Sequence, residues 1–212
     1  MAKRSIDAIL SFIALLVLSP VLGLVALTIR IFTPGPALYR GIRVGRSGCE
    51  FEMLKFRTMR VDAERVGGAS TPDDDSRVTR VGTFLRRYKL DELPQLWNVL
   101  VGDMSLVGPR PQVPWAVERY TEEEKILLTV RPGITDSASL RFANEGEILK
   151  GHPNPNRAYF DLIHPEKMRL SIHDVKNRSF LGDLKILVAT LGAATRTASD
   201  QNRSTRAQNH NP

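Results

Sequence analysis

The longest apolar stretch of the chain lies near its N-terminal end, where no charged residue occurs from Ala8 to Ile29. As an α-helix, these 22 residues would measure about 33 Å, which is enough to cross a bilayer core of about 30 Å. No A-x-A-like cleavage site follows, and the run is long for the apolar core of a secretory signal peptide. The pattern therefore predicts that residues 1–32 form a membrane helix.

Ser19 and Pro20 lie in the middle of this apolar run. A proline inside a helix removes a hydrogen bond and costs about 3 kcal/mol. Basic residues stand before the run, at Lys3 and Arg4, and after it from Arg30 onward, so the positive-inside rule favours the cytoplasm for both ends. A re-entrant helix that enters the membrane and turns back would meet these conditions. Kinked spanning helices also exist, because neighbouring groups can satisfy the freed carbonyl, so the residues alone leave both arrangements open.

Two β-favouring runs, Ala37–Val44 and Glu50–Phe56, follow this segment and flank a turn that contains glycines. Such a pattern predicts a β-hairpin. The hairpin carries Arg40, Arg43 and Arg46, and basic side chains beside a membrane segment are attracted to anionic headgroups. An ordinary basic stop after a membrane segment is the competing explanation for these three arginines.

Most of the remaining chain shows helical patterns interrupted by polar loops. The expected fold class is therefore α+β and mostly helical, with the small β-hairpin and a compact helical domain at residues 33–194. Residues 102–111 contain too many turn formers for a regular element, and Gly133 marks a turn. Residues 195–212 lack any large apolar residue, so we expect a disordered tail there.

Two acids, Asp91 and Glu92, stand just before a predicted helix. Pro94 fits the first turn of that helix, where its missing N–H does no harm. A helix N-terminus favours negative charge, so one explanation is that the two acids cap the helix. The other is a site where both acids take part in chemistry. The helix is predicted by apolar residues at the spacing of a single helical face, namely Leu93, Leu96, Trp97, Leu100 and Val101.

The charge balance adds a statement about partners. The net charge is +7 and the pI is near 9.8, which indicates an anionic partner such as nucleic acid, anionic lipid or a phosphorylated substrate. No nucleic-acid-binding motif occurs, so we expect no nucleic-acid partner. The one cysteine, Cys49, excludes an intramolecular disulfide and favours a reducing, cytoplasmic setting for the part outside the membrane.

Several cations accompany the acid pair. Arg110 is held between two prolines, so a stiff loop presents its guanidinium in a way that suits bidentate recognition of a phosphate. Arg86 precedes the acids by a few residues, and Lys55 and Arg57 stand in the second predicted strand and just after it. Acids beside several cations are the combination expected of a phosphoryl-transfer site assisted by Mg²⁺.

The blocks LKFRTM, LDELPQLWNVLVGDMSLVGPRP and RPGIT resemble the bacterial sugar transferase family, and more closely its small monotopic members that act on polyprenyl phosphate. The resemblance extends from Lys3 to about Leu187. It implies transfer of a sugar 1-phosphate from a nucleotide sugar, usually a UDP-sugar, to undecaprenyl phosphate. The products would be UMP and an undecaprenyl-diphosphate sugar, an early intermediate of polysaccharide and glycoconjugate biosynthesis.

The resemblance also implies a place for the protein. It indicates the bacterial cytoplasmic (inner) membrane, with the active site on the cytoplasmic face. Residues 1–32 would form a re-entrant helix broken at Ser19 and Pro20, and residues 33–194 the catalytic domain.

The resemblance further implies roles for the polar residues. Asp91 would be the nucleophile that forms a covalent phosphosugar intermediate, and Glu92 would hold Mg²⁺ or deprotonate the incoming phosphate. Both acids are expected to contact Mg²⁺. The cations expected to bind the phosphates of the two substrates are Lys55, Arg57, Arg86 and Arg110.

One position departs from the family pattern, because Asp136 stands after RPGIT where many members have glycine. This departure puts any transfer of sugar specificity through that region in doubt. Two other functions stay open at this point. One is a non-catalytic adaptor at the membrane surface with an inactive acid pair, and the other is a membrane-anchored nucleotide-sugar phosphohydrolase.

Overall fold

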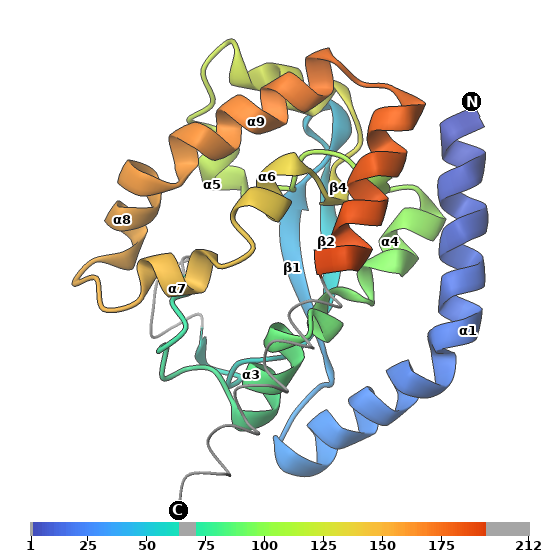
Figure 1. The fold of residues 1–212 in the computed structure, drawn as a ribbon. Coiled ribbons are helices and arrows are strands. Elements are labelled where there is room, and N and C mark those ends of the chain that lie inside the picture. The colour runs from blue at the N-terminus through green and yellow to red at the C-terminus, as the bar shows by residue number, and fades with distance from the viewer. Residues whose placement is uncertain (1, 64–70, 194–212) are drawn as a thin grey trace, which may run out of the picture.

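The computed structural model describes residues 2–63 and 71–193, so the tail expected at residues 195–212 lies outside the described part of the chain. The described residues are mostly helical, with two small two-stranded sheets (Figure 1). A further helix covers residues 180–193. The elements are α1 (Ala2–Phe32), β1 (Leu38–Val44), η1 (Arg46–Gly48), β2 (Glu50–Phe56), α3 (Arg80–Arg87), η2 (Leu90–Glu92), α4 (Gln95–Val101), β3 (Ser105–Val107), α5 (Pro114–Val117), η3 (Glu124–Thr129), β4 (Gly133–Thr135), α6 (Ser137–Arg141), α7 (Glu145–Leu149), α8 (Pro155–Leu162) and α9 (His164–Lys176).

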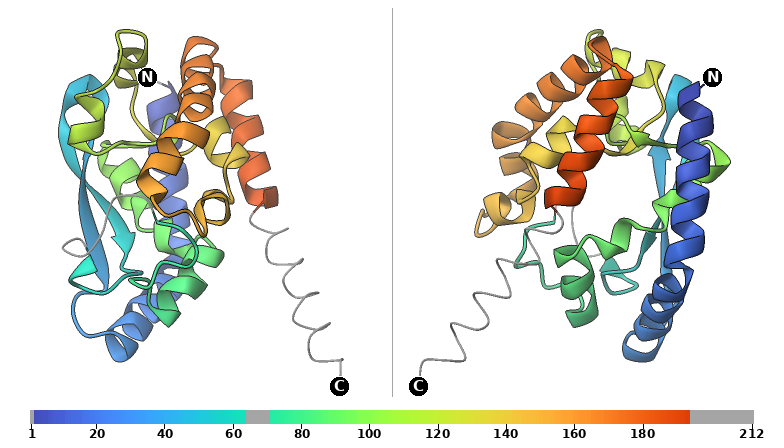
Figure 2. Two further views of the ribbon diagram at one scale, coloured as in Figure 1. Left: turned by 90° about the vertical axis from the view of Figure 1, so that its left-hand side faces the viewer. Right: turned by 45° about the vertical axis from the view of Figure 1, so that its right-hand side comes forward.

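The predicted β-hairpin is confirmed. Strands β1 and β2 pair antiparallel in a register that runs from Leu38 opposite Phe56 to Val44 opposite Glu50. Met53 and Phe56 are both buried, but they lie three positions apart in β2 and so point to opposite faces of the hairpin, where each belongs to a separate hydrophobic cluster. The long hairpin follows one side of the domain, as Figure 2 shows.

The second sheet corrects two predictions. Residues 102–111 were expected to lack a regular element and Gly133 to mark a turn, but β3 and β4 pair in parallel with Ser105 opposite Gly133. The glycines explain the difference. A Cβ on Gly133 would lie 2.1 Å from the backbone nitrogen of Gly108. Here glycine allows two backbones to approach closely, which sequence patterns alone do not distinguish from a turn.

The N-terminal turns of α1 are attached to the domain by polar contacts. Arg4 donates through Nη2 to the carbonyl oxygen of Leu100 (2.7 Å), near the C-terminal end of α4. This arginine therefore satisfies a carbonyl group that the helix leaves without an internal donor. Asp7, which is buried, accepts a hydrogen bond of 2.7 Å from the hydroxyl of Ser105 in β3.

The C-terminal end of α1 contacts the same domain. Ile29 is buried in a cluster with Phe56 and Leu85. Thr33 and Pro34 directly follow the helix. Arg57, which follows β2, donates through its two terminal nitrogens to the carbonyl oxygens of these residues, each at 2.8 Å. Both ends of α1 therefore rest against one folded body.

α1 continues through Ser19 and Pro20 to Phe32, so these residues do not end the helix, although its ribbon changes direction along its length (Figure 1). Pro20 has no N–H to donate to the carbonyl of Leu16 four residues earlier. The hydroxyl of Ser19 donates to that carbonyl instead, at 2.8 Å. By length and composition, α1 is the one helix in the described residues that could cross a membrane.

The predicted helix after the acid pair is confirmed as α4, but only part of its apolar face, including Leu96, points into the core. Trp97 and Val101 are more than half exposed, whereas Asn98 and Val99 are buried. The side-chain oxygen of Asn98 accepts from the N–H of Leu54 (2.9 Å), and its nitrogen donates to a β2 carbonyl. The amide thus fixes α4 against the edge of the hairpin.

We expect Gly35→Ala to lower the stability of the domain by about 2 kcal/mol more than Gly48→Ala. Both glycines have positive φ, +109° and +78°, so both alanines pay for a left-handed backbone. At Gly35 the new Cβ would lie 2.3 Å from Nη1 of Arg57 and would disturb the two carbonyl contacts of that arginine. At Gly48 no atom lies within 4 Å of the new Cβ, so this second loss does not occur there. Thermal unfolding of the two variants in the same detergent checks this. Equal losses would show that the Arg57 anchor contributes little.

Candidate active site

The acid pair lies in the short 3-10 turn η2, between α3 and α4. Lys89 immediately before it has a positive φ of +55°, which turns the chain at the end of α3. Pro94 is the N-cap residue of α4, and that cap has no side-chain hydrogen bond. The two acids thus stand just before α4, as the capping explanation expects, although Pro94 rather than either acid is the N-cap residue.

Glu92 is held by two cations from distant parts of the chain. Lys55 of β2 donates to Oε1 at 2.9 Å. Arg110 contacts both carboxylate oxygens, one of them at 3.3 Å, from the loop after β3. Burial opposes ionisation of Glu92, but the charges and hydrogen bonds of Arg110 and Lys55 outweigh it and hold its pKa well below the ordinary value. Glu92 is therefore ionised at neutral pH.

Asp91 has a different environment. It is 7% exposed, and its buried Oδ1 has no hydrogen-bond partner among the described residues. Burial, followed by the charge of Glu92, raises the pKa of Asp91, although Lys55 and Arg86 act in the opposite direction. The two neighbouring carboxylates therefore differ in affinity for protons, as expected where two acids have separate tasks.

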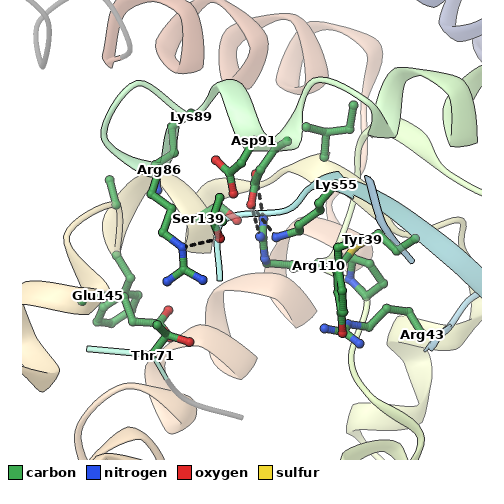
Figure 3. A pocket seen from close by; sticks show the side chains of 18 of the residues that line it. Tyr39, Arg43, Lys55, Thr71, Arg86, Lys89, Asp91, Arg110, Ser139 and Glu145 are labelled. Atoms are coloured by element: carbon green, nitrogen blue, oxygen red, sulfur yellow. Dashed lines mark hydrogen bonds and ion pairs between the residues drawn. The ribbon is translucent and has the colours of Figure 1, made fainter. Parts of the chain in front are cut away.

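Cations flank Asp91 on two sides, as Figure 3 shows. Lys55 and Arg110 stand on one side, and Arg86 and Lys89 on the other. Arg86 donates through Nε to the hydroxyl of Thr58 at 2.9 Å, which fixes the guanidinium beside the site. Anionic groups bound next to Asp91 would meet positive charge on both sides.

The structure thus brings together Asp91, Glu92, Lys55, Arg86 and Arg110. Arg57 was expected to bind phosphate with them, but its guanidinium donates to the carbonyls after α1. This arrangement gives Arg57 a part in holding the membrane segment and adds no support for a phosphate contact. The sequence pattern could not distinguish the role of Arg57 from that of Lys55, because the two residues lie two positions apart within the same block, LKFRTM.

An open cavity of about 1740 Å³ surrounds the acid pair. Sequence reasoning did not assign several of its lining residues to the site. The sequence explained Arg43 only by its place after the membrane segment, either through attraction to headgroups or as an ordinary basic stop, yet it lies beside Tyr39 at the cavity (Figure 3). Others in the cavity wall are Thr71, Ser139 and Glu145. In the sequence, these residues differ in no way from other polar residues of loops and short helices, so no pattern could have assigned them to the site.

The oxygen atoms available at the site can be compared with those that the expected Mg²⁺ would need. No group of three or more His, Cys, Asp or Glu side chains that could hold a metal ion occurs within residues 2–63 and 71–193. Mg²⁺ is commonly bound by one or two carboxylates together with substrate phosphates. The free, buried Oδ1 of Asp91 fits this kind of site. The oxygens of Glu92 are shared with Lys55 and Arg110.

Asp136, the residue that departs from the family pattern, has a structural explanation. It is the N-cap of α6, and its Oδ1 accepts from the N–H of Ser139 at 2.7 Å. Its other oxygen accepts from the hydroxyl of Ser171 in α9 at 3.0 Å. Asp136 therefore begins a helix and ties it to α9, and the arrangement of Asp91 and Glu92 does not depend on a glycine there.

Comparison with known proteins identifies the family of this chain. The family described as "Bacterial sugar transferase" matches residues 1–197. A relative from Escherichia coli (strain K12), named UDP-glucose:undecaprenyl-phosphate glucose-1-phosphate transferase, is 42% identical over 192 residues, which are 89% of this chain and 39% of that protein. A relative of the same name from Caulobacter vibrioides is 36% identical over 196 residues, 89% of this chain and 68% of that protein.

A third relative bears the name of a different sugar. The UDP-N-acetylgalactosamine-undecaprenyl-phosphate N-acetylgalactosaminephosphotransferase of Aeromonas hydrophila is 40% identical over 141 residues, which are 65% of this chain and 33% of that protein. The chain thus matches about a third to two fifths of the length of the Aeromonas and Escherichia relatives. The family match covers nearly all of this chain, and its relatives are named as transferases. The chain is therefore an enzyme of the bacterial sugar transferase family.

Proposed function

We propose that this enzyme transfers a sugar 1-phosphate from a UDP-sugar to undecaprenyl phosphate and releases UMP. The observation that carries the proposal is the contrast between the two acids. Glu92 is held by two cations, while Asp91 keeps a buried oxygen without a hydrogen-bond partner among the described residues and has a raised pKa. Such a carboxylate is a competent nucleophile once it is ionised.

In the first step, a carboxylate oxygen of Asp91 attacks the phosphorus that bears the sugar. The bond from that phosphorus to the bridging oxygen breaks, and UMP leaves with the electron pair. A phosphosugar–aspartyl intermediate remains. Lys55, Arg110 and Arg86 surround the reacting groups, so their positive charge offsets the negative charge of the diphosphate.

In the second step, an oxygen of undecaprenyl phosphate attacks the same phosphorus, and Asp91 leaves as a carboxylate. A direct reaction between the two anionic substrates would bring like charges together in one encounter. Dividing the transfer at a carboxylate lets each anion enter in turn, with the same cations facing it.

Glu92 acts in this scheme as a fixed charge rather than as a base. A carboxylate whose pKa lies well below the ordinary value is a weak proton acceptor at neutral pH. Its two contacts hold Lys55 and Arg110 beside Asp91. When Mg²⁺ is bound, the acids available to hold it are Asp91 and Glu92, and the ion would neutralise charge on the substrate phosphates.

We further propose that α1 is re-entrant and that the active site faces the cytoplasm at the inner membrane. Both ends of α1 contact the same domain, through Arg4 at one end and Ile29 at the other. A spanning helix would have to place those contacts on opposite sides of the bilayer. Exposed apolar side chains also lie outside α1, at Trp97 in α4 and at Leu184 and Val188 in the last helix, and suit a membrane surface.

The substrate class proposed here is UDP-sugars in general. Relatives of similar identity are named for glucose and for N-acetylgalactosamine, so identity alone does not select one sugar. Release of UMP from a panel of UDP-sugars is the direct way to choose among them.

The central test uses purified protein with Mg²⁺ and a panel of UDP-sugars. We expect one UDP-sugar to give a burst of UMP equal to the enzyme present, and continued turnover to a lipid-linked product once undecaprenyl phosphate is added. Asp91→Asn should abolish both the burst and the trapped phosphosugar, because an amide does not serve as the nucleophile.

Asp161→Asn is the matched control, because Asp161 is an exposed carboxylate on α8 and should leave both steps intact. Continued release of free sugar phosphate without lipid would favour a phosphohydrolase. Substantial turnover by Asp91→Asn would remove Asp91 from the covalent step.

The raised pKa of Asp91 predicts a pH dependence for the first step. The burst rate should fall as pH drops through a value above the ordinary carboxyl range, because only ionised Asp91 attacks. Glu92→Gln removes a neighbouring negative charge and releases Lys55 and Arg110 toward Asp91. Both changes favour the ionised carboxylate, so the acidic limb of the profile should move to lower pH.

This profile is measured on the UMP burst with UDP-sugar alone, where no lipid phosphate titrates. A limb that stays in place in Glu92→Gln, together with slowing confined to the lipid step, would instead identify Glu92 as the base.

The re-entrant proposal predicts that both ends of α1 face the cytoplasm. With Cys49→Ser as background, Ala2→Cys and Phe32→Cys place single cysteines at the two ends, both of which are exposed. A membrane-impermeant maleimide added outside spheroplasts should label neither, and should label both after lysis. Labelling of Ala2→Cys from outside would show a spanning helix.

A further inference from the structure

Part of the cavity wall is built from aromatic side chains, although aromatic residues make up only 7% of the sequence. They come from α5, α8 and the start of α9, and from the segment between α5 and η3. We call this group the aromatic wall. Its members, all of which line the cavity, are Trp115, Tyr120, Tyr159, Phe160 and His164.

Four rings of the aromatic wall, all except Tyr120, are linked by ring contacts. The centroids of Trp115 and Phe160 are 6.3 Å apart, and those of Phe160 and His164 are 5.1 Å apart. Tyr159 meets Phe160 edge to face at 5.4 Å. Trp115 nevertheless remains 42% exposed, so packing within the domain does not use its whole surface. Arg119 lies 5.3 Å from the centre of its ring and adds a cation to this part of the cavity.

His164 adds a polar group to this wall. Its Nδ1 is buried and has no hydrogen-bond partner among the described residues, while Nε2 lies 3.7 Å from a carboxylate oxygen of Glu124. Burial lowers the pKa of His164, so the ring is neutral near pH 7. A neutral imidazole nitrogen can form one hydrogen bond with a ligand, either as donor or as acceptor.

The aromatic wall lies across the domain from the membrane helix. Figures 1 and 2 show α8 and α1 on opposite sides of the fold. The cavity wall on the α1 side includes Leu10 and Ala14, which suit a lipid chain. Arg110 connects the acid pair with the aromatic wall, because it contacts Glu92 and its charge also acts on Tyr159.

We propose that the aromatic wall binds the uracil base of the nucleotide sugar, with Trp115 as a stacking surface and His164 Nδ1 as a hydrogen-bond partner. The wall offers flat π surfaces, which nucleobases bind by stacking. With the base at the wall, the diphosphate reaches Arg110 and the sugar-bearing phosphorus lies near Asp91. The inference rests on the proposed function for its choice of a uridine nucleotide.

The test uses UMP as the probe and the fact that the chain has two tryptophans. In Trp97→Phe the remaining indole is Trp115, and in Trp115→Phe it is Trp97 on the exposed face of α4. The tryptophan fluorescence is excited at a wavelength longer than the absorption band of uracil. The fluorescence of Trp97→Phe should then show saturable quenching by UMP, and that of Trp115→Phe should show none. Ribose 5-phosphate, which has a phosphate but no base, should quench neither.

A second variant measures the size of the effect. Trp115→Leu should weaken UMP binding about tenfold by equilibrium dialysis, as expected for the loss of one stacked base. His164→Ala should weaken UMP binding while leaving the affinity for ribose 5-phosphate unchanged. Quenching of Trp97 instead of Trp115, or equal binding of UMP and ribose 5-phosphate, would overturn the proposal.

These outcomes separate this inference from the proposed function. Binding of UMP at Trp115 without any lipid-linked product would keep the base site and remove the transferase reaction. Normal lipid-linked product with UMP binding unchanged in Trp115→Leu would keep the reaction and remove the base site.

Discussion

Two carboxylates on neighbouring residues repel each other, and the repulsion grows when both are removed from water. Asp91 and Glu92 meet this condition in η2. The domain places two cations on Glu92 and leaves an oxygen of Asp91 without a partner among the described residues. Lys55 comes from the hairpin and Arg110 from the loop after β3, so the arrangement of the fold around η2 is what separates the two acids.

The elements around the acid pair are held in place largely by hydrogen bonds from side chains to the backbone. Asn98 binds the edge of β2 next to the strand position of Lys55. Arg4 binds the end of α4, and Arg57 binds the chain after α1. The membrane helix and the acid pair are therefore linked through α4 and β2, which brings a site for anions to the side of an apolar helix.

The sequence predicted the features that depend on neighbours along the chain. The membrane helix, the β-hairpin and α4 follow from local patterns of apolar residues, and the motif around Asp91 located the acid pair. The parallel pairing of β3 with β4 was missed because it depends on the close approach of Gly108 and Gly133 from distant segments. The contrast between the two acids was missed for the same reason, since the partners of Glu92 lie 37 and 18 residues away.

The hydrogen bond from Ser19 to Leu16 makes the effect of Ser19 on the membrane helix depend on Pro20. Pro20 leaves the Leu16 carbonyl without its usual N–H, and the neighbouring hydroxyl supplies the replacement. Loss of the serine alone would leave a carbonyl unsatisfied in lipid, whereas loss of the proline alone would make the hydroxyl redundant. The two residues therefore act together in this stretch of α1, because the hydroxyl of one replaces the donor that the other lacks.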